Sequence, residues 1–234
     1  MNSNLLAFGF LEYVVFLLST TCHEAAHALV AKLGGDPTAS EGGQVSLNPI
    51  PHMRRELFGM VILPLLGILM GTGLIGYASA PYNPAWSIQY PKRSGLMSLA
   101  GPAANFLLAI LAGIAMAIGL STGAFQPDSG AGGSIVTAAS SDLMAGAATI
   151  LSVFFTLNLL LGCLNLLPIP PLDGFGVLGL FTNSEGQLRL QRLRMQLRGP
   201  WMLAGILLAS RLLGYLYDPL RELGVRTIYG FYRG

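Results

Sequence analysis

Two histidines and a glutamate, His23, Glu24 and His27, form an HExxH pattern near one end of a long apolar segment. Positions i and i+4 share a helix face, so both imidazoles can bind one zinc ion while Glu24 reaches a water molecule beside it. Zinc brings the pKa of such a water near neutrality, and a glutamate can take its proton as the oxygen attacks a carbonyl. The pattern indicates hydrolysis, although short motifs also arise by chance.

A catalytic zinc ion needs a third protein ligand and an open fourth position. Asp173 is the strongest candidate because it follows the proline-rich run at 168–171, which must end the preceding helix. An aspartate at this place could instead cap a helix that begins at Gly174. Taken alone, that structural role is the better interpretation of Asp173.

The composition is that of a membrane protein. Hydrophobic residues make up 53% of the chain and charged residues 10%, with a mean hydropathy of +0.60. The net charge of +2 is too small to indicate nucleic-acid binding. Ionisable groups are costly inside a bilayer, so two histidines and a glutamate in a spanning segment favour a functional site.

The sequence predicts an all-α membrane protein, a polytopic bundle of transmembrane helices. Residues 4–33 predict one long helix, which would measure roughly 45 Å and end at Gly34-Gly35. Short alternation at 44–47 predicts a small strand or hairpin. We expect a single membrane-embedded domain over 1–234, with a core at 4–180 and a helical C-terminal region at 181–234. The other predicted spans are 96–120, 144–167 and, weakened by Arg211, 200–217.

A shared metal ion restricts the topology of these segments. His23 and Asp173 must lie at the same membrane side, so the 144–167 span runs towards that side and the 96–120 span runs away from it. Residues 57–78 must then leave this side and return to it. They are therefore predicted to be re-entrant, which Pro64 and several glycines permit if protein or water covers the broken backbone.

The charged residues support this arrangement. Most Lys and Arg residues fall on the side of the metal motif, whereas the loop at 122–143 carries Asp128 and Asp142 and neither Lys nor Arg. By the positive-inside rule, the side of the motif is cytoplasmic. If 200–217 spans the membrane, Arg221, Arg226 and Arg233 lie outside, against this rule, so an interfacial helix is the alternative. The basic residues on the motif side are Lys32, Arg54, Arg55, Lys92, Arg93, Arg189, Arg192, Arg194 and Arg198.

Other polar residues within apolar segments allow two interpretations each. Asn105 and Asn165 could hydrogen-bond a substrate strand or a developing oxyanion, or could equally join helices; for Asn158 the packing role is favoured. His52 could be a loop hydrogen-bonding group, an oxyanion donor or a reserve ligand, and the loop role ranks first by composition. Glu12 shares the histidine face and could line a water path or be satisfied by a neighbouring helix.

Four motifs, in their order and spacing, closely resemble the site-2 protease family of intramembrane zinc metalloproteases (peptidase M50). They are the HExxH pattern, the LNP-histidine run at 47–52, AGPAAN at 100–105 and the run from Asn165 to Gly174. The resemblance covers roughly residues 4–180. It implies that His23, His27 and Asp173 bind one Zn²⁺ ion and that Glu24 is the general base.

The resemblance further implies that Asn105 and Asn165 line the active site, and a recurring histidine in the family raises the other roles of His52. The chain departs from the family at Met53-Arg54-Arg55, where an aspartate and proline often stand. Better-studied relatives also carry PDZ or CBS domains, for which this chain has no room. Substrate selection is therefore expected to come from the membrane domain or from a membrane adaptor.

We expect a zinc metalloendopeptidase that hydrolyses peptide bonds within or next to transmembrane segments, in regulated proteolysis. Its partners would be a transmembrane protein substrate and the lipid bilayer, with no nucleic acid, and a homo-oligomer stays open. The expected location is a prokaryotic inner membrane, with the active site towards the cytoplasm. The alternatives are a catalytically silent protein that binds membrane helices and a zinc-handling membrane protein. The intact Glu24 argues against the first, since a binder needs no base.

Overall fold

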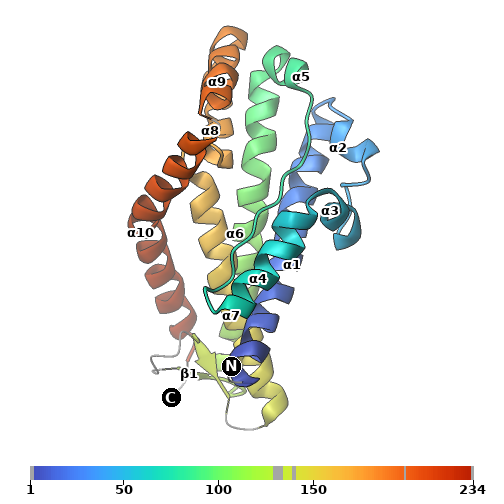
Figure 1. The fold of residues 1–234 in the computed structure, drawn as a ribbon. Helices are drawn as coiled ribbons and strands as arrows, with labels where there is room; N and C mark the ends of the chain where they lie inside the picture. The colour runs from blue at the N-terminus through green and yellow to red at the C-terminus, as the bar shows by residue number, and fades with distance from the viewer. Residues whose placement is uncertain (1–2, 129–133, 139–140, 198, 233–234) are drawn as a thin grey trace.

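The protein is an all-α, polytopic membrane protein, shown in Figure 1 as a computed structural model that describes residues 3–128, 134–138, 141–197 and 199–232. Within these residues, three helices are long and apolar enough to cross a membrane: α1 (Ser3–Leu33), α6 (Pro91–Ser121) and α7 (Asp142–Leu166). They agree with the spans predicted at 4–33, 96–120 and 144–167. Helix α6 packs against both α1 and α7 and forms the centre of the bundle.

Local sequence signals explain where these helices begin and end. Helix α1 ends before Gly35, which has a left-handed φ of +96° that favours glycine. Helix α6 begins at Pro91, whose fixed φ and missing N–H suit the first turn. Helix α7 is capped by Ser141, whose side chain accepts a hydrogen bond from the Met144 N–H.

Helix α10 (Pro200–Tyr229) completes the bundle but is not among the candidate spans found in the described residues. Its C-terminal half packs on α6 and α7: Ile228 belongs to the same buried apolar cluster as Phe155. The Tyr229 hydroxyl donates to the Ile135 carbonyl at 2.7 Å, at the end of the molecule opposite α9. Helix α10 therefore runs along the bundle, and the interfacial arrangement of 200–217 stays a prediction.

Residues 57–78 turn back, as predicted. A π-helix, η1 (Phe58–Ile62), leads into α4 (Leu63–Met70), which ends at Gly71 with a left-handed φ of +69°. The chain then returns in extended form over 72–83 to α5 (Pro84–Gln89), as Figure 1 shows. Two glycines permit this close return, because a Cβ atom on Gly59 or Gly67 would lie 2.3 Å from the carbonyl oxygen of Tyr77 or Gly73 respectively.

The strand expected at 44–47 is absent, and this prediction was wrong. Two short helices, α2 (Thr38–Glu41) and α3 (Pro49–Arg55), flank a turn and bend there. Asn48 caps α3 by accepting from the Ile50 N–H, and Pro49 follows at the first helical position, so the local signals favour a helix start. The two-stranded antiparallel sheet, β1 (Gln126–Pro127) with β2 (Val136–Thr137), lies at the opposite end of the bundle.

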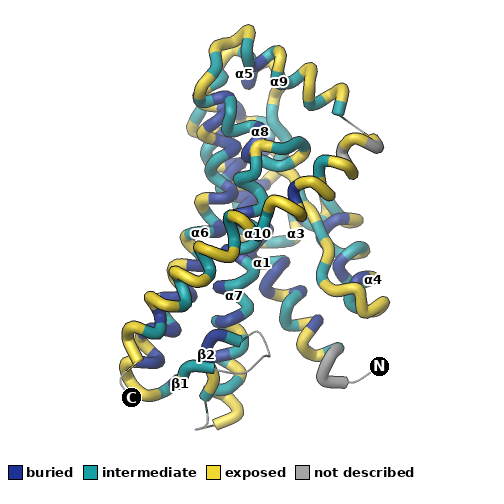
Figure 2. Tube along the Cα trace, turned by 90° about the vertical axis from the view of Figure 1, so that its left-hand side faces the viewer, coloured by how far each residue is buried: buried dark blue, intermediate teal, exposed yellow. Residues whose placement is uncertain are grey.

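Three further elements gather near the C-terminal end of α7: α8 (Asp173–Val177), the 3-10 helix η2 (Leu178–Phe181) and α9 (Ser184–Gln196). Figure 2 shows the buried residues concentrated where α1, α6 and α7 meet, while α4, α9 and α10 each leave a side exposed. The core of the fold is thus the junction of the three candidate spans.

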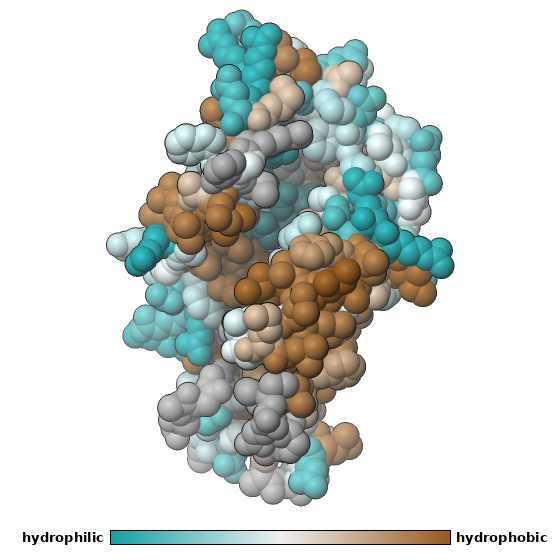
Figure 3. Space-filling view, in the orientation of Figure 1, coloured by the Kyte–Doolittle hydropathy of each residue, from teal (hydrophilic) through white to brown (hydrophobic). Residues whose placement is uncertain are grey.

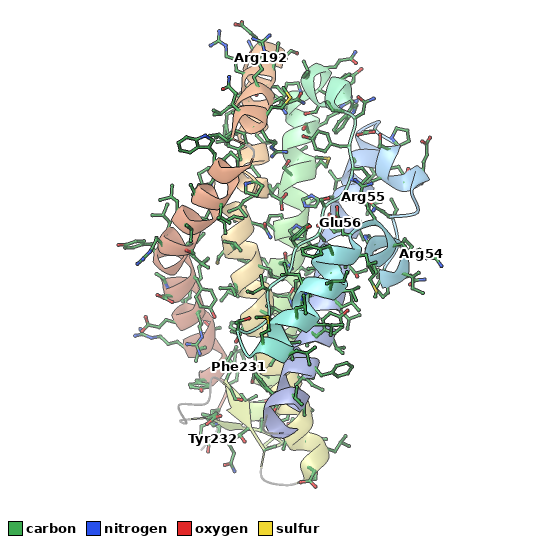
Figure 4. All side chains as sticks on the ribbon, viewed as in Figure 1. Arg54, Arg55, Glu56, Arg192, Phe231 and Tyr232 are labelled. Atoms are coloured by element: carbon green, nitrogen blue, oxygen red, sulfur yellow. The ribbon has the colours of Figure 1, made fainter. Side chains whose placement is uncertain are left out.

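Most of the basic residues predicted on the motif side lie at one end of the bundle, whereas Arg221 and Arg226 lie on the C-terminal half of α10, towards the other end. Lys32, Lys92, Arg93 and the α9 arginines lie on elements at one end, and Asp128 and Asp142 at the other. Figure 4 places Arg54 and Arg55 about midway along the molecule, well below Arg192. Arg198 and Arg233 lie outside the described residues.

The return of the re-entrant segment should depend on Gly59. We expect Gly59→Ala to lower the stability of the protein in detergent by about 1–3 kcal/mol, because the added methyl group meets the Tyr77 carbonyl. Gly146→Ala on α7 is the matched control, since nothing lies within 4 Å of its Cβ position. Denaturation of the two variants, side by side, measures the difference. Equal stability would contradict the packing described.

Candidate metal centre

The two histidines of α1 meet Asp173 in the interior of the bundle. His23 and His27 are each 6% exposed and lie one turn apart on one face of α1. Asp173 reaches them as the first residue of α8, after the proline run has ended α7 at Leu166. One oxygen, Oδ2, lies 3.0 Å from His23 Nε2 and 3.3 Å from His27 Nε2.

The spacing of these three atoms fits a zinc ion. The two Nε2 atoms are 3.0 Å apart, and one ligand atom of each residue lies within 4.8 Å of the others. Ligands bound at about 2.0–2.1 Å and separated by a tetrahedral angle lie roughly 3.3 Å from one another. Two imidazoles and one carboxylate also match the donor set of a catalytic zinc site with one open position.

Gly101 of α6 leaves the space that such an ion requires. A Cβ atom at this position would lie 2.3 Å from His27 Nε2 and 2.5 Å from His23 Nε2. The glycine therefore faces the candidate metal-binding atoms themselves. Its place one turn before Asn105, in the AGPAAN motif, was the available signal.

Each histidine makes a further hydrogen bond through its Nδ1 atom. The Nδ1 atom of His23 lies 2.5 Å from Asn105 Oδ1, and that of His27 lies 2.6 Å from the Met97 carbonyl oxygen. Both partners are acceptors, so each Nδ1 atom carries a proton and each Nε2 atom keeps a lone pair for a metal. Such outer hydrogen bonds fix the ring orientation of metal-binding histidines.

The charge of Asp173 suits the same role. Burial alone would raise the pKa of its carboxyl group, but the adjacent His27 and His23 more than offset burial and lower the pKa below its ordinary value. This direction favours the carboxylate, which is the form that binds a cation.

Glu24 lies beside the cluster without belonging to it. It is 4% exposed, and its Oε2 atom is buried with no hydrogen-bond partner among the described residues. A buried carboxylate oxygen without a partner is costly, and in native structures such atoms point to water or a ligand. Glu24 Oε2 is thus an unpaired oxygen next to the group formed by His23, His27 and Asp173, and Glu24 itself is outside that group.

The remaining predicted site residues differ in placement. Asn105 is fully buried and hydrogen-bonded to His23. His52 is 2% exposed, lies outside the metal group and bonds through Nε2 to the Ser46 carbonyl at 2.9 Å, which matches its loop role. Asn165 is half-buried and makes no side-chain hydrogen bond in the described part of the chain. Glu12 is half-buried on the face of α1 that also carries Phe16.

The bundle and its cluster define an integral membrane protein with a candidate metal-binding site at an HExxH motif. Comparison of the chain with known families gives the more specific assignment: it belongs to peptidase family M50, whose model matches residues 11–209. This confirms the family resemblance found in the motifs.

The relatives are named as candidate zinc metalloproteases. YwhC of Bacillus subtilis is 34% identical over 171 residues, which is 70% of this chain and 66% of YwhC. Rip2 of Mycolicibacterium smegmatis is 31% identical over 175 residues, 75% of this chain, and Rip2 of Mycobacterium tuberculosis (strain H37Rv) is 33% identical over 176 residues, also 75%. The match covers 58% of each Rip2 protein, so the chain spans no more than about two thirds of these relatives.

No solved structure matches the chain. The family and the names of the relatives identify Zn²⁺ as the cofactor, in agreement with the sequence prediction. The close group of His23, His27 and Asp173 is where the described residues offer ligands for it.

Gly101 provides a test of the metal centre that leaves every ligand in place. We expect Gly101→Ala to abolish stoichiometric zinc binding, because the new methyl group fills the space beside both Nε2 atoms. Gly113→Ala on the same helix is the control, since its Cβ would make only ordinary contacts at 3.6 Å. Zinc content of the purified proteins measures the effect. Full zinc content in Gly101→Ala would show that the metal lies elsewhere.

Proposed function

We propose that the protein is an intramembrane zinc metalloendopeptidase that cleaves transmembrane proteins within or next to their spanning segments. The observation that carries the proposal is the free Oε2 atom of Glu24 beside the cluster of His23, His27 and Asp173, at the junction of the three candidate spans. A structural metal site has no use for an unpaired carboxylate oxygen, whereas a hydrolase needs a base at this place.

In this proposal His23, His27 and Asp173 hold the zinc ion, which supplies Lewis acidity towards water and the scissile carbonyl. Glu24 takes a proton from the attacking water and passes it to the leaving nitrogen. Asn105 orients His23 and does not contact substrate, because both the oxygen and the nitrogen of its amide are engaged in hydrogen bonds within the bundle. Asn165 remains the candidate for contact with substrate, since its amide is half-buried and uncommitted.

A transmembrane substrate must unwind before its carbonyl groups become accessible, because a helix engages them in its own hydrogen bonds. The extended residues 73–80 offer a backbone edge for such a peptide. Exposed and half-buried residues alternate there along the chain, with Ile75, Tyr77 and Ser79 exposed. Its Tyr77 N–H donates to the Gly59 carbonyl, so the N–H groups of Gly76 and Ala78 point to the opposite side.

This edge passes close to the metal centre. A Cβ on Gly76 would lie 2.4 Å from the Phe16 ring, so the segment contacts α1 seven residues before His23, or about 10 Å along the helix. Three extended residues also cover about 10 Å, which brings the segment level with His23 near Ser79. A peptide paired with 75–79 would therefore lie beside the cluster.

The surface allows approach from one side. Figure 3 shows it hollowed between the apolar N-terminal part of α10 and the α3–α4 segment, with less hydrophobic atoms deeper inside. The apolar rims include Leu203 and Ile206 on α10, Ile62 on η1 and Leu66 on α4, and all four side chains are exposed. Such rims suit a substrate that arrives from the lipid.

The proposed location is a prokaryotic inner membrane, with the metal centre towards the cytoplasm, because Lys32, Lys92, Arg93 and the arginines of α9 lie on elements at that end of the bundle. A role in regulated proteolysis follows from the chemistry, since one cut next to a span releases a soluble domain. A membrane adaptor or a second copy of the chain would supply further selectivity.

Two substitutions separate catalysis from metal binding. Glu24→Gln should abolish cleavage of a co-expressed single-span protein, by at least about 10²-fold from loss of the base, while zinc content stays at one per chain. Asp173→Asn should lose both cleavage and zinc, since the amide is a far weaker ligand. Zinc analysis and immunoblots of the substrate provide the measurements. A Glu24→Gln protein that cleaves normally would refute the mechanism, and a zinc-handling protein would show transport without any cleavage.

Ala78→Pro tests the substrate edge. Proline removes the Ala78 N–H, which points away from Gly59, so the proposed substrate strand would lose one hydrogen bond to this edge. We expect about a two- to tenfold decrease in cleavage. Zinc content should not change. Ala78→Ser is the matched control, because it keeps the N–H at nearly the same size. Equal cleavage by both variants would remove this edge from the mechanism.

A further inference from the structure

A chain of hydrogen bonds continues from His23 into the bundle beyond Asn105. Asn105 Nδ2 donates to Asn158 Oδ1 on α7 over 2.9 Å, and Asn158 Nδ2 donates to Ser19 Oγ over 2.9 Å. Asn105, Asn158 and Ser19 are all 0% exposed. Since Ser19 and His23 both belong to α1, the four side chains close a ring through the three candidate spans. The proposed mechanism assigns no role to Asn158.

The direction of this chain is set by a backbone carbonyl. The oxygen of Phe154 can only accept, and Asn158 Nδ2 donates to it over 2.9 Å. The Oδ1 atom of Asn158 must therefore face Asn105, which donates to it through Nδ2. The Oδ1 atom of Asn105 then faces His23. The proton of the His23 ring then lies on Nδ1, and Nε2 is left free to bind a metal.

We propose that Asn158 is a positioning residue that fixes the tautomer and orientation of His23 through Asn105, and thereby sets the zinc affinity of the site. Without the Asn158 oxygen, the Asn105 amide can rotate and turn its NH₂ group towards the N–H of His23, donor against donor. Ser19 contributes less, because the Phe154 carbonyl already orients Asn158. The inference rests on the proposed role of His23 as a zinc ligand.

Three substitutions on α7 separate positioning from packing. Asn158→Leu keeps a similar volume but removes both the donor and the acceptor. Asn158→Asp keeps an acceptor towards Asn105 and serves as the conservative rescue. Thr156→Val is the matched control, since Thr156 has a buried hydroxyl with no partner among the described residues and lies outside the ring.

The measurements use the full chain in detergent. Zinc affinity is obtained by competition with a chromophoric chelator, and ¹⁵N NMR of the histidine-labelled, zinc-loaded protein shows which ring nitrogen carries a proton. Only three histidines have to be assigned. We expect Asn158→Leu to bind zinc about 10–100-fold more weakly and to lose the protected Nδ1–H signal of His23. Asn158→Asp and Thr156→Val should retain both.

Wild-type affinity and an unchanged His23 signal in folded Asn158→Leu would overturn the proposal. If Asn158→Leu does not fold, Asn158→Asp decides the matter, because weak zinc binding by that variant contradicts a role as acceptor. Failure of the proposed function has a different signature: His23→Ala would then retain its zinc. A failed positioning role leaves His23→Ala without zinc and Asn158→Leu fully loaded.

Discussion

The structure depends on the need to hydrogen-bond the candidate ligand side chains, which are buried among apolar helices. In such surroundings an unpaired donor or acceptor costs several kcal/mol, so each imidazole must be engaged at both nitrogens. Asn105 and the Met97 carbonyl engage the Nδ1 atoms, and the Nε2 atoms face Asp173. Because these partners come from α1, α6 and α8, the site fixes how those helices pack, and the helices in turn fix the site.

The re-entrant hairpin obeys the same constraint by different means. Non-helical backbone at membrane depth is tolerated only where protein or water covers it. Here the extended return packs on its own helix, with glycines where the two backbones come closest, at Gly59 and Gly67. The uncovered edge near Gly76 and Ala78 is the part that a peptide could complete. Residues 57–78 look like a poor membrane span in the sequence. In the structure they form a helix and an extended return whose backbone packs on that helix along one edge and is open along the other.

Much of this arrangement could be predicted from the sequence. The HExxH spacing predicts two ligands on one helix face, and the resemblance to the site-2 protease family adds Asp173. A shared ion then predicts the direction of each span, which the charge distribution supports. The strand predicted at 44–47 does not form. Four alternating residues are too weak a signal to outweigh the helix start that Asn48 and Pro49 set. The roles of Gly101 and Asn158 could not be predicted, because both depend on how the helices pack. Gly101 leaves space beside the Nε2 atoms of two histidines on another helix, and Asn158 is oriented by the Phe154 carbonyl on its own helix α7.

The separation of the ligands along the chain has a consequence for biosynthesis. His23 lies on α1, and Asp173 follows 150 residues later. At a synthesis rate of roughly 5–20 residues per second, Asp173 is added on the order of 10 s after His23. During that interval the nascent chain contains a base and two imidazoles but no complete metal centre. The order of the residues therefore means that the full set of candidate ligands, His23, His27 and Asp173, exists only after α1, α6 and α7 have all been synthesised.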